Sequence, residues 1–289
     1  MLKLTKISLT VPPEIKDMAS DFLLGLDAEA VSEDDIKGNF KVSALFPIDT
    51  DLEPIMQKLY HYMDFLKNNI KDFNIDEVNV EHIDRSSWEI WRNELKRVKA
   101  GKNIFITPPW DLSNCAKNKH LIVINPSMAF GTGHHETTKL CISYIEELNN
   151  TKRFETILDV GCGSAILSIA AIKLGVTKGV CFDIDPVAVK EARENIERNK
   201  VSKDITHFCG FIQGVRGIYD LIVANISVEA ILLMKNEIKS RLSPDGYLIL
   251  SGIPLMRKDE LSSGIIDAGF TQNEERTDGE WTGMVFKKN

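Results

Sequence analysis

The first 84 residues alternate between strand-like and helix-like patterns of apolar side chains. In "KISLTV", Ile7, Leu9 and Val11 occupy every second position, which is typical of a strand with one buried face. The segments "PPEIKDMASDFLLGL" and 52–66 repeat apolar residues at three- and four-residue spacings, which predicts two helices. The runs "KVSALFP" and "DEVNVEHI" predict two more strands. We therefore expect a small α+β domain over residues 1–84.

From Leu121 onward, short apolar runs alternate with helical segments. The runs are "TILDV", "KGVCFDI", "ITHFC", "YDLIVANI" and "GYLILSGI". This alternation is typical of an α/β fold in which a doubly wound, mostly parallel sheet carries helices on both faces. The C-terminal stretch "FTQNEERTDGEWTGMVFKK" has two strand-like runs around Asp278 and Gly279, which predicts a closing hairpin.

Residues 85–110 separate these two patterns. Trp88, Trp91 and Leu95 share one face of a predicted helix, so we expect a helical connector at 85–110 and a second domain at 111–289. The two indole rings either contact a substrate or pack the connector onto a neighbouring domain, and their large apolar area favours packing.

Composition narrows the class of protein. Of the 289 residues, 43% are hydrophobic and 27% are charged, which describes a globular protein with a buried core. No apolar run approaches the length that spans a bilayer, and Lys3 and Lys6 interrupt any signal-peptide core at the N-terminus. The five cysteines form no CxxC pair, which favours reduced thiols and a cytoplasmic location.

The charge is unevenly distributed along the chain. Residues 1–84 hold eight lysines, no arginine and seventeen acids, a net charge of −9, whereas the remainder has 27 basic and 25 acidic residues. A negative field disfavours binding to nucleic acid and suits a basic partner. Solubility alone would also explain the acidic segment.

The stretch "ILDVGCGSAIL" reads as a strand, a glycine turn and the start of a helix. Gly161 and Gly163 allow a sharp turn whose backbone amides face a ligand. Asp183 stands twenty-two residues after Gly161, at the end of the next predicted strand, where a carboxylate accepts hydrogen bonds from ribose hydroxyls. The pattern predicts a site for a nucleoside ligand. Ile166 occupies the sixth position of the dinucleotide fingerprint, which disfavours a NAD-binding site without excluding one.

Asn225 ends the predicted strand "YDLIVANI" and therefore points at the same crevice as Asp183. Its amide offers a donor and an acceptor without charge, which suits holding a neutral amine; a turn-forming role is the alternative.

A second loop, "NPSMAFGTGHHETTKL", precedes a helix whose first turn contains Thr137 and Thr138. Free amides and hydroxyls at a helix start favour an anionic group such as a carboxylate. His134 and His135 suggest zinc, but adjacent ligands diverge and no third ligand follows at a suitable spacing, so we expect no metal.

The combination of Asp159-x-Gly161-x-Gly163-x-Ala165 with these stretches resembles class I S-adenosylmethionine-dependent methyltransferases. Together with "DIDPVAVKEARENIERN", "LILSGI", "SWEIWRNELK" and "EWTGMVFKK", it is similar to the PrmA family, the methyltransferases of bacterial large-subunit ribosomal protein eleven. The resemblance covers nearly the whole chain and is most specific from Ser86 onward. Family members usually carry glycine where Ala165 stands.

The resemblance implies a Rossmann-like methyltransferase sheet of seven strands after a small ferredoxin-like domain. It places cofactor contacts for S-adenosylmethionine at Thr138, Gly161, Asp183 and Asn225, and we add Gly163 from the turn itself and assign Asn225 a catalytic role. The implied reaction methylates lysine side chains or the N-terminal amine of a basic ribosomal protein docked by residues 1–84. Another protein lysine or a small-molecule amine is the alternative substrate. We expect a monomer that contacts neither nucleic acid nor membrane.

Overall fold

The computed structural model describes residues 3–26, 28, 30–36, 38–69, 78–84, 97–112, 119–125 and 135–288. The chain divides into two compact units, one built from the elements between residues 3 and 84 and the other from those between residues 97 and 288. Among the described residues, no helix combines the length and the apolar character that crossing a membrane would require.

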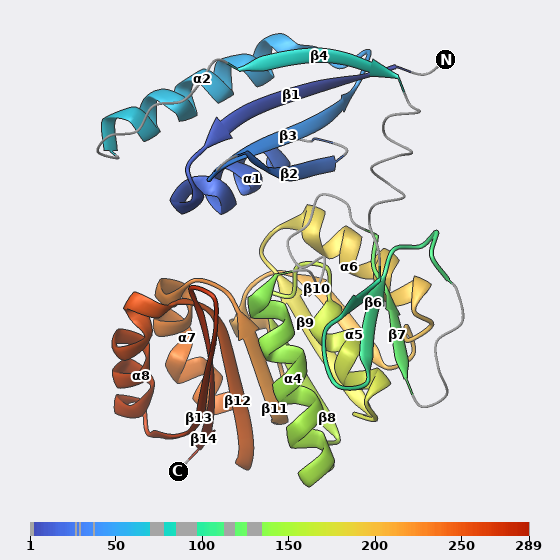
Figure 1. The fold of residues 1–289 in the computed structure, drawn as a ribbon. Coiled ribbons are helices and arrows are strands. Elements are labelled where there is room, and N and C mark those ends of the chain that lie inside the picture. Colours follow the sequence, from blue (N-terminus) through green and yellow to red (C-terminus); the bar gives the residue numbers. More distant parts are fainter. Residues whose placement is uncertain are drawn as a thin grey trace. The chain divides into compact units, whose positions relative to one another are not determined.

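The first unit has the element order β-α-β-β-α-β, drawn in blue to cyan in Figure 1. Its elements are β1 (Lys3–Val11), a short 3-10 turn (Pro13–Ile15), α1 (Lys16–Leu24), β2 (Ala30–Ile36), β3 (Asn39–Pro47), α2 (Leu52–Asn69) and β4 (Asn79–Asp84). The sheet has the order β2-β3-β1-β4, and every pair in it is antiparallel.

The alternation predicted for β1 is confirmed, because Ile7, Leu9 and Val11 are all buried against the helices. From α2, Leu59 and Leu66 complete the same core and are fully buried. These residues belong to the main apolar core of the first unit.

Strand β2 was not predicted from the sequence. It is an edge strand that pairs only with β3, and three of its seven residues are consecutive acids. An edge strand with exposed carboxylates shows no alternation of apolar and polar residues, so the hydrophobic pattern did not reveal it.

The second unit contains a seven-stranded sheet of order β10-β9-β8-β11-β12-β14-β13. The five strands from β10 to β12 are parallel, and β14 and β13 are antiparallel to their neighbours as the predicted hairpin. The strands are β8 (Thr156–Val160), β9 (Lys178–Asp183), β10 (Ile205–Cys209), β11 (Tyr219–Asn225), β12 (Leu242–Pro254), β13 (Phe270–Asp278) and β14 (Trp281–Lys288). The helices are α4 (Glu136–Thr151), α5 (Ile166–Lys173), α6 (Pro186–Arg198), α7 (Val228–Arg241) and α8 (Lys258–Asp267), with short 3-10 turns η2 (Ile212–Gly214) and η3 (Leu255–Arg257).

Alternate residues of the sheet face two separate apolar cores. Ile157 and Val223 pack with α4, α5 and α6, whereas Leu158 and Ile222 pack with α7 and α8. Figure 1 shows these two helix groups on opposite sides of the strands. Because both faces are covered, the parallel strands are nearly continuous apolar runs, and the sequence predicted them correctly.

A three-stranded sheet adds to the first of these cores. It consists of β5 (Val98–Lys99), β6 (Ile104–Thr107) and β7 (His120–Val123), in the order β5-β6-β7. Ile104 and Ile106 are buried in the core of the second unit. Within the expected helical connector at 85–110, residues 98–99 and 104–107 form strands and not a helix. Trp88, Trp91 and Leu95 lie outside the described residues.

Candidate active site

The carboxyl edge of the parallel sheet gathers most of the candidate site residues. Asp183 is the last residue of β9, the glycine turn follows β8, and Asn225 is the last residue of β11. These strands are neighbours in the order β9-β8-β11, so the three groups lie side by side at one edge. This is the edge at which doubly wound sheets bind ligands.

The glycine turn depends on backbone conformations that glycine adopts readily. Gly161 has φ of 68° and Gly163 has φ of 49°. A Cβ on Gly161 would lie only 2.5 Å from Cγ2 of Ile226, so this position is closed to larger residues on steric grounds as well. The Gly161 amide donates a 3.0 Å hydrogen bond to the Phe182 carbonyl oxygen, which joins the turn to β9.

Ala165 adopts the same left-handed conformation, with φ of 61°, although it has a side chain. This conformation costs an alanine about 1 kcal/mol or more. The Ala165 amide still donates to the Cys162 carbonyl oxygen at 2.8 Å, and α5 begins immediately afterwards. The substitution of alanine for the usual glycine therefore preserves the turn and adds backbone strain.

The Asp183 carboxylate is oriented by two backbone amides. Oδ2 accepts from the Gly163 amide at 2.9 Å, and Oδ1 accepts from the Asp185 amide at 3.1 Å. Each carboxylate oxygen accepts more than one hydrogen bond, so both retain capacity for a pair of ligand hydroxyls.

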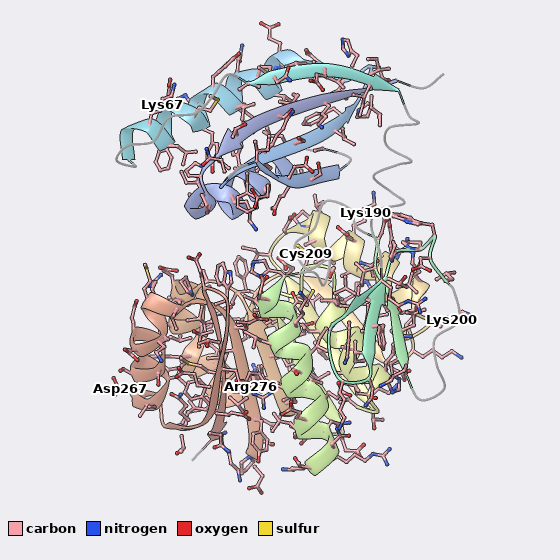
Figure 2. All side chains as sticks on the ribbon, in the orientation of Figure 1. Lys67, Lys190, Lys200, Cys209, Asp267 and Arg276 are labelled. Carbon is pink, nitrogen blue, oxygen red and sulfur yellow. The ribbon has the colours of Figure 1, made fainter. Side chains whose placement is uncertain are left out.

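Apolar side chains that the sequence analysis missed lie exposed near this carboxylate. Ile184 is 67% exposed directly after β9, and Phe211 is 68% exposed shortly after β10. Cys209, labelled in Figure 2, is the register partner of Asp183. The signal in the sequence was an apolar residue directly after the strand-terminal acid, Ile184 after Asp183, and another after the next strand, Phe211.

Asn225 is held by a chain of hydrogen bonds that reaches α4. The His135 Nδ1 atom accepts from the Thr137 amide at 3.3 Å and lies 2.7 Å from Thr137 Oγ1. Since Nδ1 accepts from the amide, it carries no proton, and Thr137 Oγ1 must donate to it. The hydroxyl then accepts from Asn225 Nδ2 at 3.2 Å.

This chain fixes the direction of the Asn225 amide. With Nδ2 directed at Thr137, Oδ1 is buried and accepts no hydrogen bond from any described residue. Thr138 Oγ1 is likewise buried without a partner in the described part of the chain, and Thr138 itself is fully buried. Buried polar atoms normally have hydrogen-bond partners, so these two atoms are candidates for contact with a ligand.

Comparison with known proteins decides the family. Residues 10–289 match the family described as ribosomal protein L11 methyltransferase (PrmA). The chain belongs to the PrmA family. It is accordingly a methyltransferase, and its parallel sheet is the α/β sheet of that class of enzyme.

Individual relatives of the PrmA family agree with this assignment. A ribosomal protein L11 methyltransferase of Exiguobacterium sp. is 36% identical over 249 residues, which cover 86% of this chain and 79% of the relative. One from Thermoanaerobacter pseudethanolicus is 35% identical over 279 residues, covering 96% and 89%. The crystal structure of a ribosomal protein L11 methylase from Lactobacillus delbrueckii subsp. bulgaricus superposes with a TM-score of 0.62 at 32% identity, covering 67% of this chain and 99% of that one.

Asp159, the first residue of the PrmA turn motif, stabilises the turn by binding the helix that follows it. Its side chain is buried, and Oδ2 accepts from the Ser168 amide at 3.0 Å and the Ser168 hydroxyl at 2.8 Å. Desolvation by burial raises its pKa to about 7 against the two hydrogen bonds from Ser168, and the nearby Asp183 carboxylate adds to the rise. Asp159 thus ties the first turn of α5 to β8.

His135 caps α4, the helix that follows the PrmA loop motif. It accepts from the Thr137 amide at the start of α4, and its ring packs edge-on against Trp281 with centroids 5.1 Å apart. Within the described ranges no cluster of three His, Cys, Asp or Glu side chains has a geometry that holds a metal ion. His134, Gly131 and Gly133 lie outside the described residues.

Proposed function

We propose that this PrmA-family chain transfers methyl groups from S-adenosylmethionine to amino groups of ribosomal protein L11, on lysine side chains, the N-terminal amine or both. The family description and the names of its relatives support this substrate. A lysine of another protein or a small-molecule amine is the alternative substrate.

The observation that carries the proposal is the pair of buried, unpartnered oxygens beside the glycine turn. Asn225 Oδ1 and Thr138 Oγ1 accept no hydrogen bond from the described residues, although both are enclosed at the carboxyl edge. The cofactor pocket would consist of Thr138, Gly161, Gly163, Asp183 and Asn225. Asp183 would hold the ribose, and the start of α4 would favour the methionine carboxylate. Bound there, S-adenosylmethionine supplies an electrophilic methyl group on a positive sulfonium.

The protein's own catalytic contribution is to hold a neutral amine in line. A lysine has a reference pKa near 10.4, so keeping it neutral at pH 7 costs about 4.6 kcal/mol. Burial beside a positive charge lowers that pKa. Asn225 Oδ1, oriented by Thr137, would accept an amine hydrogen and align the nitrogen lone pair, a gain from positioning.

The described carboxylates near the site are poor candidates for a general base. Both Asp183 oxygens are turned towards the backbone amides that orient them, and Asp159 is buried beneath the turn with Oδ2 held by Ser168. We therefore assign the proton released from the amine to bulk water.

The first unit would dock the substrate. Its element order and sheet order match the ferredoxin-like pattern, and residues 1–84 carry a charge of −9, which attracts a basic protein. In the described part of the chain, its core shares no residue with the cores of the second unit. Removing residues 1–84 should therefore leave cofactor binding intact and abolish methylation of the intact protein substrate. Methylation that survived this deletion would refute the docking role.

The proposed enzyme is also cytoplasmic and monomeric, and it binds no nucleic acid directly. The most direct experiment incubates the purified chain with methyl-labelled S-adenosylmethionine and either ribosomal protein L11, another basic protein or free lysine. We expect label on amino groups of L11 alone. Label on the other basic protein or on free lysine, with none on L11, would favour the alternative substrate.

A further inference from the structure

An exposed apolar turn, η3, follows β12, the strand that pairs with β11. In η3, Met256 is 91% exposed and Leu255 is 43% exposed. Exposed methionines are common on surfaces that adapt to a bound chain. The reaction assigned to Asn225 does not use either residue.

The strand register places this turn above Asn225. Asn225 ends β11 opposite Ser251 of β12, and β12 continues as a strand to Pro254. At roughly 3.3 Å per residue, the three residues of β12 that follow Ser251 span at most roughly 10 Å before η3 begins, because the strand is irregular between Leu250 and Ile253. Gly252, with φ of 79°, lets β12 pass the Asn225 amide, because a Cβ there would lie 3.1 Å from Asn225 Oδ1.

This height matches the reach of a lysine side chain. A lysine spans roughly 6 Å from Cα to Nζ, so an amine held at Asn225 places the substrate backbone several ångströms above it. Residues that flank the modified lysine would then lie at the level of Leu255 and Met256.

The elements around the turn are acidic. The segments 227–230, 255–260 and 277–281 contain five acids and two bases. One of the two bases, Arg257, is paired with both Glu229 and Glu260, and the other, Lys258, contacts Glu275.

The hairpin turn brings further negative charge to the same place. The Leu255 amide donates to the Glu280 carbonyl oxygen at 2.8 Å, which holds η3 beside the turn between β13 and β14. Asp278 and Glu280 are exposed, and neither forms an ion pair with another described residue. An apolar turn with unpaired carboxylates beside it fits a basic chain with long aliphatic side chains.

We propose that Leu255 and Met256 form the lip of the active site that receives the lysine-bearing segment of a basic protein substrate. The aliphatic parts of the segment pack on Met256, and its positive charges face Asp278 and Glu280. This inference rests on the proposed function.

The test compares two serine substitutions at exposed apolar positions of the second unit. Met256→Ser removes the apolar lip, and Ile218→Ser is the matched control, because Ile218 is 54% exposed and precedes β11 at the opposite edge of the sheet. For Met256→Ser we expect a roughly tenfold rise in KM for ribosomal protein L11, since most of a methionine contact is lost. The kcat, the melting temperature and the Kd for S-adenosylmethionine should stay at wild-type values, and Met256→Leu should restore KM.

Two outcomes would overturn the lip. One is an unchanged KM in Met256→Ser, and the other is an equal rise in Ile218→Ser. Failure of the proposed function is distinguishable from both, because the wild-type chain would then not methylate ribosomal protein L11 at all. That result would also refute the role of Leu255 and Met256.

Discussion

Replacing Thr137 with valine isolates the hydrogen-bond chain that orients Asn225. Thr137 is fully buried, and valine keeps its shape while removing the hydroxyl. The substitution deletes the 3.2 Å bond from Asn225 Nδ2 and the 2.7 Å bond to His135 Nδ1. The amide of residue 137 still donates to His135 Nδ1, so His135 still caps the start of α4.

The expected decrease in kcat follows from the loss of the preferred orientation of the Asn225 side-chain amide. One hydrogen bond contributes about 1 kcal/mol to the amide orientation in which Oδ1 faces the ligand, and a buried amide without a partner costs about 1–3 kcal/mol. Once Thr137 is valine, both amide orientations become populated, and the flipped one presents a donor to a donor. We therefore expect kcat to fall by about two- to fivefold, the loss that an orientation preference of about 1 kcal/mol supports, with a modest loss of stability.

The assay measures kcat for methylation of ribosomal protein L11 together with the Kd for S-adenosylmethionine and the melting temperature. Thr137→Ser is the control, because it keeps the hydroxyl and should retain most of kcat. A folded Thr137→Val protein with the wild-type kcat would refute the assignment of Asn225 Oδ1 as the group that aligns the amine.

Three further substitutions test the rest of the site. Asp183→Asn places an amide NH₂ against the backbone donor of Gly163, and the side chain loses its charge and one acceptor. The Kd for S-adenosylmethionine, measured by calorimetry, should rise by about 10- to 100-fold. A Kd within twofold of wild type would contradict this. Gly252→Ala introduces a Cβ 2.9 Å from a backbone carbonyl oxygen at a φ of 79°, and it should lower the free energy of unfolding by about 2 kcal/mol or more in a denaturant titration. The control is Gly279→Ala, which has open space around it at a φ of 58° and should cost about 1 kcal/mol. Equal costs for the two variants would rule out the steric argument. Burial raises the pKa of Asp159 from 3.8 to about 7. The free energy of unfolding should therefore fall by up to about 4 kcal/mol as the pH rises from 4 to 7, because the buried carboxyl loses its proton over that range. Asp159→Asn should flatten that part of the pH profile, and an unchanged slope would show that Asp159 does not titrate there.

The parallel sheet could be predicted from the sequence because both of its faces are buried. Such strands are continuous apolar runs, and the positions of Asp183 and Asn225 at their carboxyl ends follow from the fold. Strand β2 could not be predicted in the same way, since an acidic edge strand is stabilised by one neighbouring strand rather than by its own pattern. The short strands β5 and β6 were missed because only two to four residues of each lie in the sheet.

The candidate site also has features that the sequence predicts and features that it does not. Sequence spacing identified the glycine turn and the acid, but it could not show that His135 and Thr137 orient Asn225. That relation joins residues 88 positions apart through one hydrogen bond, and its direction depends on which nitrogen of His135 carries the proton. Ala165 is a third case, because its left-handed conformation is imposed by the turn around it and is disfavoured by the residue itself.

The separation of the apolar cores has a consequence for how such a chain can diverge. A core substitution in the β-α-β-β-α-β half leaves the interior of the catalytic half untouched in the part of the chain that the structure describes. Descendants of this gene could therefore exchange one half by recombination and inherit the other unaltered. A chimera that joins residues 97–289 to the corresponding N-terminal half of a relative should fold with an ordinary cooperative transition in each half, and its choice of target would follow the donor of the grafted piece.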